Sequence, residues 1–305
     1  MDNNKLDSLR ILVLAENTAM HGTRFLAQHG MSYLLQAQTK LTTRTILVDV
    51  GQNHYALIHN MGMFGINPQD IDMIVITHSH YDHTKGLSSL LREIGKEEIP
   101  VVGHPDNFKL NLKVDPYLHH IGMALDDQPQ NITANGGRLF LTKEPLQLMP
   151  GLTTTGEVPR LTDFEDPGIK LYTINNGRIE KDTIMDDISI VANIKAHGIV
   201  VITGCGHAGI VNIVRHAVSI FPEQPLNGII GGFHLIDAND MRIQQTIKEL
   251  LTFNPRFLSA GHCTGFKAQA AFAKGFKDKF IQLTCGLEFI ISSTANGEFR
   301  NPVIF

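Results

Sequence analysis

The sequence contains no tryptophan and only three cysteines, and charged residues make up 18% of its 305 positions. Three widely spaced cysteines, an odd number, indicate a reducing compartment rather than a disulfide framework. A net charge of −4 excludes the global basic field that holds nucleic acid, and there is no acidic tail. The first apolar run, residues 11–15, is too short for a signal-peptide core or a membrane span. We therefore predict a cytoplasmic protein that binds neither nucleic acid nor membranes.

The chain is rich in hydrophobic residues and in histidine. Its hydrophobic content of 43% can fill a sizeable core, so we expect a globular protein. Many of its 15 histidines stand beside glycine, a pattern that suggests metal chemistry.

Strand-length and helix-length segments alternate along the chain. Short apolar or β-branched runs that end in turn residues predict strands at 10–15, 32–36, 45–50, 73–77, 151–155, 188–193, 199–203, 226–230 and 287–291. Helical periodicity occurs at 54–64, 86–93, 210–221, 240–251 and 267–276. This alternation predicts an α/β protein in which helices cover the sheets.

One irregular stretch interrupts the alternation. Residues 107–135 contain two prolines, a histidine pair and an acidic pair, and long irregular connections in compact domains are usually functional or disordered. The chain otherwise lacks linkers, repeats and low-complexity tracts. We predict a single domain over 1–305, with an inserted segment at about 104–150 near the functional site.

The most informative motif is a strand-like run, residues 74–77, that leads directly into His78, His80, Asp82 and His83. Alternate residues at an extended loop start point the same way, so His78 and His80 can bind one cation while Asp82 and His83 reach a second. Imidazole and carboxylate ligands suit zinc, iron or manganese. Two such ions can hold a hydroxide that attacks an electrophile, with Asp82 orienting it. A polar loop of solvated histidines is the alternative interpretation.

Three further histidines stand in glycine-flanked loops after strands. They are His207 in Thr-Gly-Cys-Gly-His-Ala-Gly, His234 in Gly-Gly-Phe-His and His262 in Ala-Gly-His-Cys-Thr-Gly. Small neighbours let a ligand approach closely, so each is a candidate metal ligand, although a buried core histidine is the alternative in each case. His207 also precedes a predicted helix, whose backbone would hold it from both sides.

The motif and its setting resemble the metallo-β-lactamase superfamily, whose hallmark is HxHxDH after a strand. The resemblance implies a four-layer αβ/βα sandwich of two mixed sheets with helices on the outer faces. It implies that Asp49, in Leu-Val-Asp-Val-Gly, supports the metal loop by a hydrogen bond to a ligand histidine. It also implies that His262 is the last metal ligand.

The second half of the chain departs from the usual superfamily pattern. Most members have a Pro-Gly-His turn and then an aspartate after a late strand, whereas here Cys205 occupies the position of that aspartate. The Thr-Thr-Gly-Glu turn that ends at Glu157 stands at the earlier position. Either Cys205 or His207 completes the second metal position, with Glu157 or His234 near the cavity, or the second site is weaker and fills only with substrate. A small buried hydrophobic residue is the alternative for Cys205.

Several phrases together resemble one branch of the superfamily, the 7,8-dihydropterin-6-methyl-4-(β-D-ribofuranosyl)aminobenzene 5′-phosphate synthases. They include His29-Gly30-Met31-Ser32, HxHxDHTxGL and Asp186-Asp187. The resemblance implies a phosphorylated small-molecule substrate. Arg160, Lys85 and Lys109 are the cations that we expect to face a phosphate, although a solvated surface position is the alternative for each lysine.

These observations predict a metal-dependent hydrolase that uses a metal-bound hydroxide on an ester or phosphoester. One alternative is a transferase that joins a dihydropterin diphosphate to an aryl ribosyl phosphate, and another is a binding scaffold without catalysis. We predict two divalent metal ions as cofactors, zinc ahead of iron or manganese. Homo-oligomerisation is left open.

Overall fold

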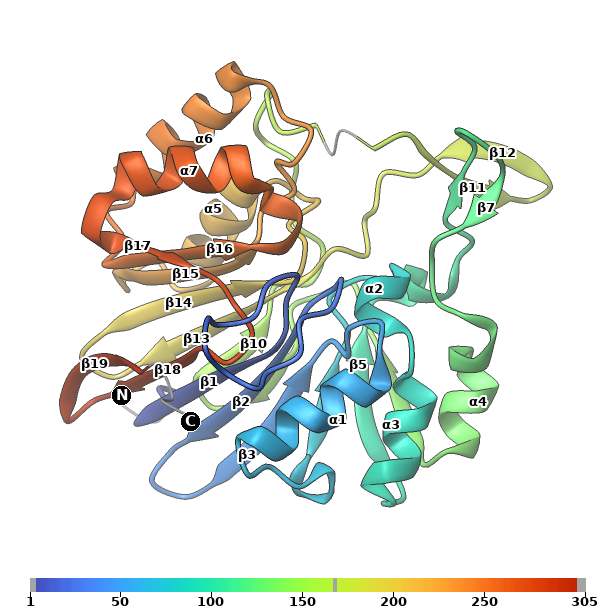
Figure 1. Cartoon of the computed structure of the whole chain (residues 1–305), viewed down its shortest axis with the longest axis horizontal. Coiled ribbons are helices and arrows are strands. Elements are labelled where there is room, and N and C mark those ends of the chain that lie inside the picture. Colours follow the sequence, from blue (N-terminus) through green and yellow to red (C-terminus); the bar gives the residue numbers. More distant parts are fainter. Residues whose placement is uncertain (1–3, 167–168, 301–305) are drawn as a thin grey trace.

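The computed structural model describes residues 4–166 and 169–300, and its centre consists of two mixed β-sheets (Figure 1). In spatial order, the eight-stranded sheet comprises β19 (Ala295–Arg300), β18 (Glu288–Ser292), β1 (Ser8–Ala15), β2 (Ser32–Gln38), β3 (Thr43–Val48), β4 (Met73–Val75), β5 (Ile99–Gly103) and β8 (Gly137–Leu141). The seven-stranded sheet comprises β17 (Phe280–Gln282), β16 (Phe257–Gly261), β15 (Leu226–Gly232), β14 (Gly198–Thr203), β13 (Ser189–Ile194), β10 (Leu152–Thr154) and β9 (Gln147–Met149).

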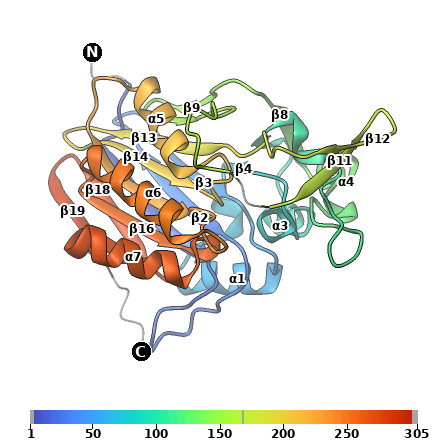
Figure 2. The same cartoon turned by 90° about the horizontal axis from the view of Figure 1, so that it is seen from above.

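Helices lie on the outer face of each sheet (Figures 1 and 2). The eight-stranded sheet is flanked by α1 (His54–Met63), α3 (Leu87–Ile94) and α4 (Pro129–Ala134), and the seven-stranded sheet by α5 (Ile210–Ile220), α6 (Asp240–Thr252) and α7 (Phe266–Phe276). A short helix, α2 (Tyr81–Thr84), follows β4. Single 3₁₀ turns are η1 (Pro68–Asp70), η2 (Pro105–Phe108), η3 (Leu125–Asp127), η4 (His262–Thr264) and η5 (Lys277–Lys279).

The hydrophobic core has three parts, which correspond to the three interfaces between four layers. Strand β14 contributes side chains to two of these parts of the core, since all six of its residues are buried. Val200 and Ile202 face the core between the two sheets, whereas Ile199 and Val201 pack against α5 and α6. A strand buried on both faces is expected to be continuously hydrophobic. The four-layer αβ/βα sandwich and the α/β class are therefore confirmed.

Part of the segment at 104–150 lies outside the sandwich. Strands β6 (Leu112–Lys113), β7 (His119–His120), β11 (Leu171–Asn175) and β12 (Arg178–Lys181) form a separate small sheet that projects from the body (Figures 1 and 2). Two strands from the end of the same segment belong to the main sheets: β8 is an edge strand of the eight-stranded sheet, and β9 is an edge strand of the seven-stranded sheet. The projecting sheet thus combines the segment at 104–150 with a hairpin that the sequence analysis did not predict.

Parallel strand pairing brings the candidate site residues to one end of the sandwich. Strands β3, β4 and β5 are parallel to one another in one sheet, as are β14, β15 and β16 in the other. The residues predicted to bind metal follow the carboxyl ends of β4, β14, β15 and β16. Within the described parts of the chain, no helix is long and apolar enough to cross a membrane.

Candidate metal centre

The metal loop begins where β4 ends. Residues 76–80 continue from the strand, and α2 begins at Tyr81 with His80 as its N-cap. The side chains of His78 and His80 lie close together, with His78 Nε2 3.1 Å from His80 Nδ1. Asp82 and His83 follow in the first turn of α2, and both are buried. The strand-to-helix transition therefore places four candidate ligands within six positions.

Three buried histidines, His78, His80 and His207, form what we name the first cluster. Their donor atoms lie within 4.8 Å of one another. Among the described residues, His80 Nε2 and both ring nitrogens of His207 have no hydrogen-bond partner. Burial lowers the pKa of all three imidazoles, to about 4 for His80, so they are neutral and able to bind a cation near pH 7. Three neutral rings, two of them with unpartnered buried nitrogens, fit a metal ion.

The second cluster consists of Asp82, His83, Cys205 and His262, all of them buried and with donor atoms within 4.8 Å of one another. Asp82 Oδ2 lies 3.2 Å from His262 Nε2 and 3.6 Å from His83 Nε2, and Cys205 Sγ lies 3.2 Å from His83 Nε2. Burial alone would raise the pKa of Asp82, but His83 and His262 hold it well below its usual range. A carboxylate, two imidazoles and a sulfur could thus surround a second ion. Cys205 belongs to this group and His207 to the other.

Asp49 lies behind the metal loop at the end of β3. Its carboxylate accepts hydrogen bonds from Thr77 N (2.7 Å) and Thr77 Oγ1 (2.6 Å), and its Oδ2 lies 2.7 Å from His83 Nδ1. This is the contact to a ligand histidine that the superfamily resemblance implies, and such contacts orient the imidazole. Gly204 lets the other half of the molecule approach, since a Cβ there would lie 2.2 Å from Thr77 Oγ1.

His262 is held by two residues that the sequence analysis missed. Its backbone N–H donates to Glu16 Oε1 at 2.5 Å, and its Nδ1 lies 2.9 Å from Asn17 Oδ1. Both partners follow β1, about 245 positions earlier in the sequence. His262 has φ 50°, a left-handed conformation that costs energy for a residue other than glycine and is frequent at functional sites. The sequence around His262, which directly follows β16, gives no indication of either partner.

Two adjacent aspartates hold one ligand loop each. Asp186 accepts a hydrogen bond from Ser79 N, between His78 and His80, at 2.9 Å. Asp187 accepts one from Ala208 N, directly after His207, at 2.8 Å. Burial raises the pKa of Asp187 to about 6. The Asp186-Asp187 phrase formed part of the family resemblance, but its role in joining the two loops depends on the tertiary structure.

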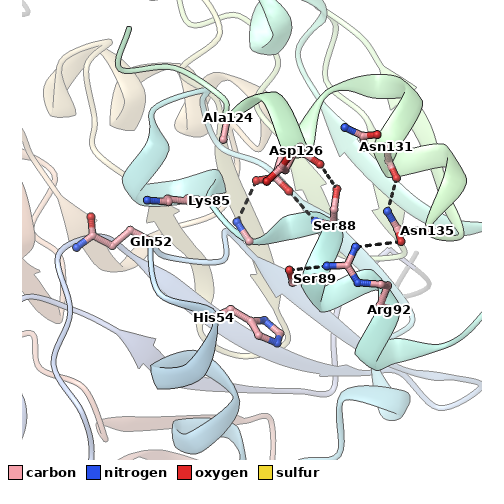
Figure 3. Close-up of a pocket in the computed structure, with 12 residues that line it drawn as sticks. Gln52, His54, Lys85, Ser88, Ser89, Arg92, Ala124, Asp126, Asn131 and Asn135 are labelled. Atoms are coloured by element: carbon pink, nitrogen blue, oxygen red, sulfur yellow. Dashed lines mark hydrogen bonds between the residues drawn. The ribbon is translucent and has the colours of Figure 1, made fainter. Parts of the chain in front are cut away.

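The cations predicted to contact phosphate have different surroundings. Lys109 Nζ forms ion pairs with Asp182 (2.7 Å) and Asp186 (3.4 Å), and Arg160 donates to the backbone carbonyls of His207, Thr183 and Ile184. These contacts place Lys109 and Arg160 beside the loops that carry the candidate ligands. Lys85 is exposed and lines an open polar pocket of about 500 Å³ beside α3, shown in Figure 3 with Gln52 and His54.

Glu157 and His234 lie in different places relative to the clusters. Glu157 Oε1 contacts His104 Nε2 (3.0 Å) and Lys143 Nζ (2.9 Å), and it joins none of the metal-type donor groups among the described residues. The His234 ring, in contrast, is tilted by 44° to that of His207, with the ring centroids 4.2 Å apart, and His234 shares a donor group with two cysteines. A further histidine, His29, lies at the solvent-exposed edge of the second cluster, which we call the rim. Its side chain is 47% exposed, and its Nε2 lies 3.4 Å from Asp82 Oδ2.

Comparison with known proteins identifies relatives over nearly the whole chain. The model of the metallo-beta-lactamase superfamily matches residues 28–167. A 7,8-dihydropterin-6-methyl-4-(beta-D-ribofuranosyl)-aminobenzene-5′-phosphate synthase of Methanocaldococcus jannaschii is 37% identical over 94% of this chain and 98% of its own length. An uncharacterised protein of the same organism is 31% identical, over 85% of this chain and 91% of its own.

Solved structures show the same fold. The structure described as a metal-dependent hydrolase of the beta-lactamase superfamily has a TM-score of 0.77 and 24% identity, covering 93% of this chain and 99% of its own. The metallo-beta-lactamase fold protein YhfI from Bacillus subtilis has a TM-score of 0.51 and 15% identity, over 93% of this chain and 100% of its own.

Proposed function

The chain belongs to the metallo-β-lactamase superfamily, and we propose that it is a metal-dependent transferase that joins a dihydropterin diphosphate to an aryl ribosyl phosphate. The observation that carries this proposal is the 37% identity to the M. jannaschii synthase, which extends over 98% of that protein. A match of this extent includes both halves of the candidate metal centre. It therefore supports the transferase that the sequence analysis held as an alternative to the hydrolase.

The reaction requires the amine of the aryl substrate to displace diphosphate from the pterin methylene. A carbon–nitrogen bond forms, the carbon–oxygen bond to diphosphate breaks, and the amine loses a proton. Divalent ions held by the first and second clusters would neutralise the charge of the departing diphosphate. The neutral rings of His78, His80 and His207 leave a bound ion's charge uncompensated and available to an anionic group.

The chain's own residues would orient the substrates around this centre. Asp82 contacts both His83 and His262 and so fixes their relative positions. His29 lies at the rim, in contact with Asp82 and half exposed, where it could donate a hydrogen bond to a phosphate oxygen. Lys85 is an exposed cation directly after α2 that is free to approach a ribosyl phosphate.

A metal-dependent hydrolase is the second candidate. It is favoured by the donor set itself, because a two-cluster site with Asp82 in contact with two ligand histidines suits hydrolysis without a second organic substrate. In this case the same residues would orient water, and the dihydropterin diphosphate or another phosphoester would be cleaved.

The test is an assay of the purified, metal-loaded protein with the dihydropterin diphosphate, with and without the aryl ribosyl phosphate. Mass spectrometry measures the coupled product and a diphosphate assay measures the leaving group. Product that forms only with both substrates, and is lost in a His78→Ala/His80→Ala double variant, supports the transferase. Equal release of diphosphate without the aryl substrate supports the hydrolase. No turnover by a fully loaded protein contradicts the transferase and the hydrolysis of this diphosphate; if a panel of other phosphoesters also fails, the result indicates a binding scaffold.

A further inference from the structure

A third donor group adjoins the second cluster. It consists of Cys205, His234 and Cys263, whose donor atoms lie within 4.8 Å of one another, and we name it the third cluster. The two cysteines are 3% and 8% exposed, and the thiol of Cys263 donates to the backbone oxygen of Cys205 at 3.3 Å. His234 and Cys263 have no part in the transferase or the hydrolase described above. Their proximity is therefore unexplained by the proposed function.

The third cluster is formed by three neighbouring parallel strands. Cys205 follows β14, His234 follows β15 and Cys263 follows β16, so their side chains converge at adjacent strand ends. Gly232 lies between the two cysteines at the end of β15. A Cβ at this position would lie 2.6 Å from Gly204 O and 2.7 Å from Cys263 Sγ, closer than a Cβ approaches other heavy atoms in proteins. The glycine therefore leaves room for the Cys263 thiol beside the backbone that follows β14.

His234 has two properties that indicate a ligand rather than a packing residue. Its Nδ1 is buried and has no hydrogen-bond partner among the residues that the structure describes. Its backbone has φ 44°, a left-handed conformation that is uncommon for residues other than glycine. Unpartnered buried polar atoms and backbone strain both concentrate at functional sites. A cation at Nδ1 would satisfy the nitrogen and compensate for the cost of this conformation.

We propose that Cys205, His234 and Cys263 hold a third, thiophilic divalent cation such as zinc, beside the two ions of the first and second clusters. Two thiolates and one imidazole are a donor set that zinc prefers, and the two negative charges balance those of the ion. Binding releases the two thiol protons to solvent, because only thiolates ligate. Cys205 also belongs to the second cluster, so its sulfur is shared between neighbouring ions.

Metal stoichiometry tests this proposal without reference to catalysis. The full-length protein is stripped with a chelator under a phosphine reductant and dialysed against Co²⁺. Bound cobalt per chain is measured by mass spectrometry, and cobalt–thiolate bonding by its near-ultraviolet charge-transfer absorption. The variants are Cys263→Ser, which is nearly isosteric, and His234→Ala. The matched control is Cys285→Ser, because Cys285 is also buried and free, but its thiol contacts the backbone oxygens of Leu14 and Glu16.

The expected result is that wild type and Cys285→Ser hold one more equivalent of cobalt than Cys263→Ser and His234→Ala. The thiolate absorption should fall in both of the latter variants. Adding His80→Ala to Cys263→Ser should remove a further equivalent, because His80 serves the first cluster. Equal stoichiometry and equal thiolate absorption in wild type and Cys263→Ser would overturn the proposal, even if His234→Ala failed to fold. This outcome is separate from the pterin assay, which can succeed with two ions.

Discussion

The first and second clusters differ in how the protein satisfies their side chains. In the first, His80 Nε2 and both nitrogens of His207 lack hydrogen-bond partners within the described chain. In the second, Asp82 pairs with His83 and His262, and those histidines are held in turn by Asp49 and Asn17. The side chains of the second cluster thus have polar partners within the protein. The first cluster has buried nitrogens that only an external group can satisfy.

From this difference we expect the two clusters to have different roles in the candidate metal centre. Three neutral histidines leave a bound cation with an open coordination position, which is typical of catalytic sites. A set containing a carboxylate and a thiol offers more negative charge and four protein donors, which is typical of tightly held ions. We therefore expect the second cluster to retain its ion more strongly, and the first to expose its ion to substrate.

Replacing a ligand of the first cluster should have the largest effect. His80→Ala should lower turnover by more than about 100-fold, since losing a direct ligand exceeds the 10–100-fold typical of outer partners. Metal content should fall by about one equivalent of the two in the first and second clusters, in line with the loss of a single site. Steady-state kinetics and elemental analysis measure both. Far-ultraviolet circular dichroism should match wild type, because the lost ring contacts only His78 of the same cluster through Nδ1 and has no protein partner at Nε2. Unchanged metal content with full activity contradicts the assignment.

Removing all metal and adding it back should show which of the first and second clusters stabilises the folded protein at lower metal concentration. An ion that binds only the folded state adds about 2.7 kcal/mol at a free concentration 100 times its Kd. Stepwise zinc addition to chelated Cys263→Ser protein, which lacks the complete third cluster, should raise Tm in two phases, the first from the second cluster. The His78→Ala/His80→Ala variant should keep the first phase and lose the second. Loss of the first phase with retention of the second in this variant would reverse the order of affinity.

A substitution of Asp49 tests how far metal binding at the second cluster depends on the contact between Asp49 and His83. Asp49→Ala should weaken metal binding by about 10–100-fold, because His83 loses the group that orients it. Competition with a chromophoric chelator measures the affinity. Asp72→Ala is the control, since Asp72 accepts a backbone hydrogen bond from Thr45 but lies in none of the three clusters. Equal affinities in the two variants would limit Asp49 to a structural role.

Sequence reasoning found the candidate ligands that stand in local patterns. His78, His80, Asp82 and His83 form one short motif, and His207, His234 and His262 are flagged by flanking glycines. Asp49 followed from the family resemblance, but the other residues that hold these side chains could not be found this way. Glu16 and Asn17 reach His262 from about 245 positions away, and Asp186 and Asp187 join loops from opposite halves. Such contacts depend on the packing of the two sheets, which no local pattern encodes.

The fold shows the same limit. Buried strands rich in β-branched residues, such as β14, were predicted within one or two positions. Strand β16, with the sequence Phe-Leu-Ser-Ala-Gly, was missed because small residues weaken its strand signal. The projecting sheet was missed because β6 and β7 have two residues each and β12 is exposed throughout. Its strands are specified by pairing across the chain rather than by hydrophobic pattern.

Arg160 provides the smallest and most discriminating test. The sequence analysis predicted a substrate contact, whereas its guanidinium donates to three backbone carbonyls, including that of the ligand His207. Arg160→Ala should therefore lower the free energy of unfolding by about 1–3 kcal/mol through unsatisfied carbonyls, with KM for the phosphorylated substrate nearly unchanged. Arg160→Lys should fail to restore stability, because an ammonium lacks the planar fork. Denaturant titration and kinetics measure the two effects. A raised KM with normal stability, rescued by lysine, would return Arg160 to the phosphate.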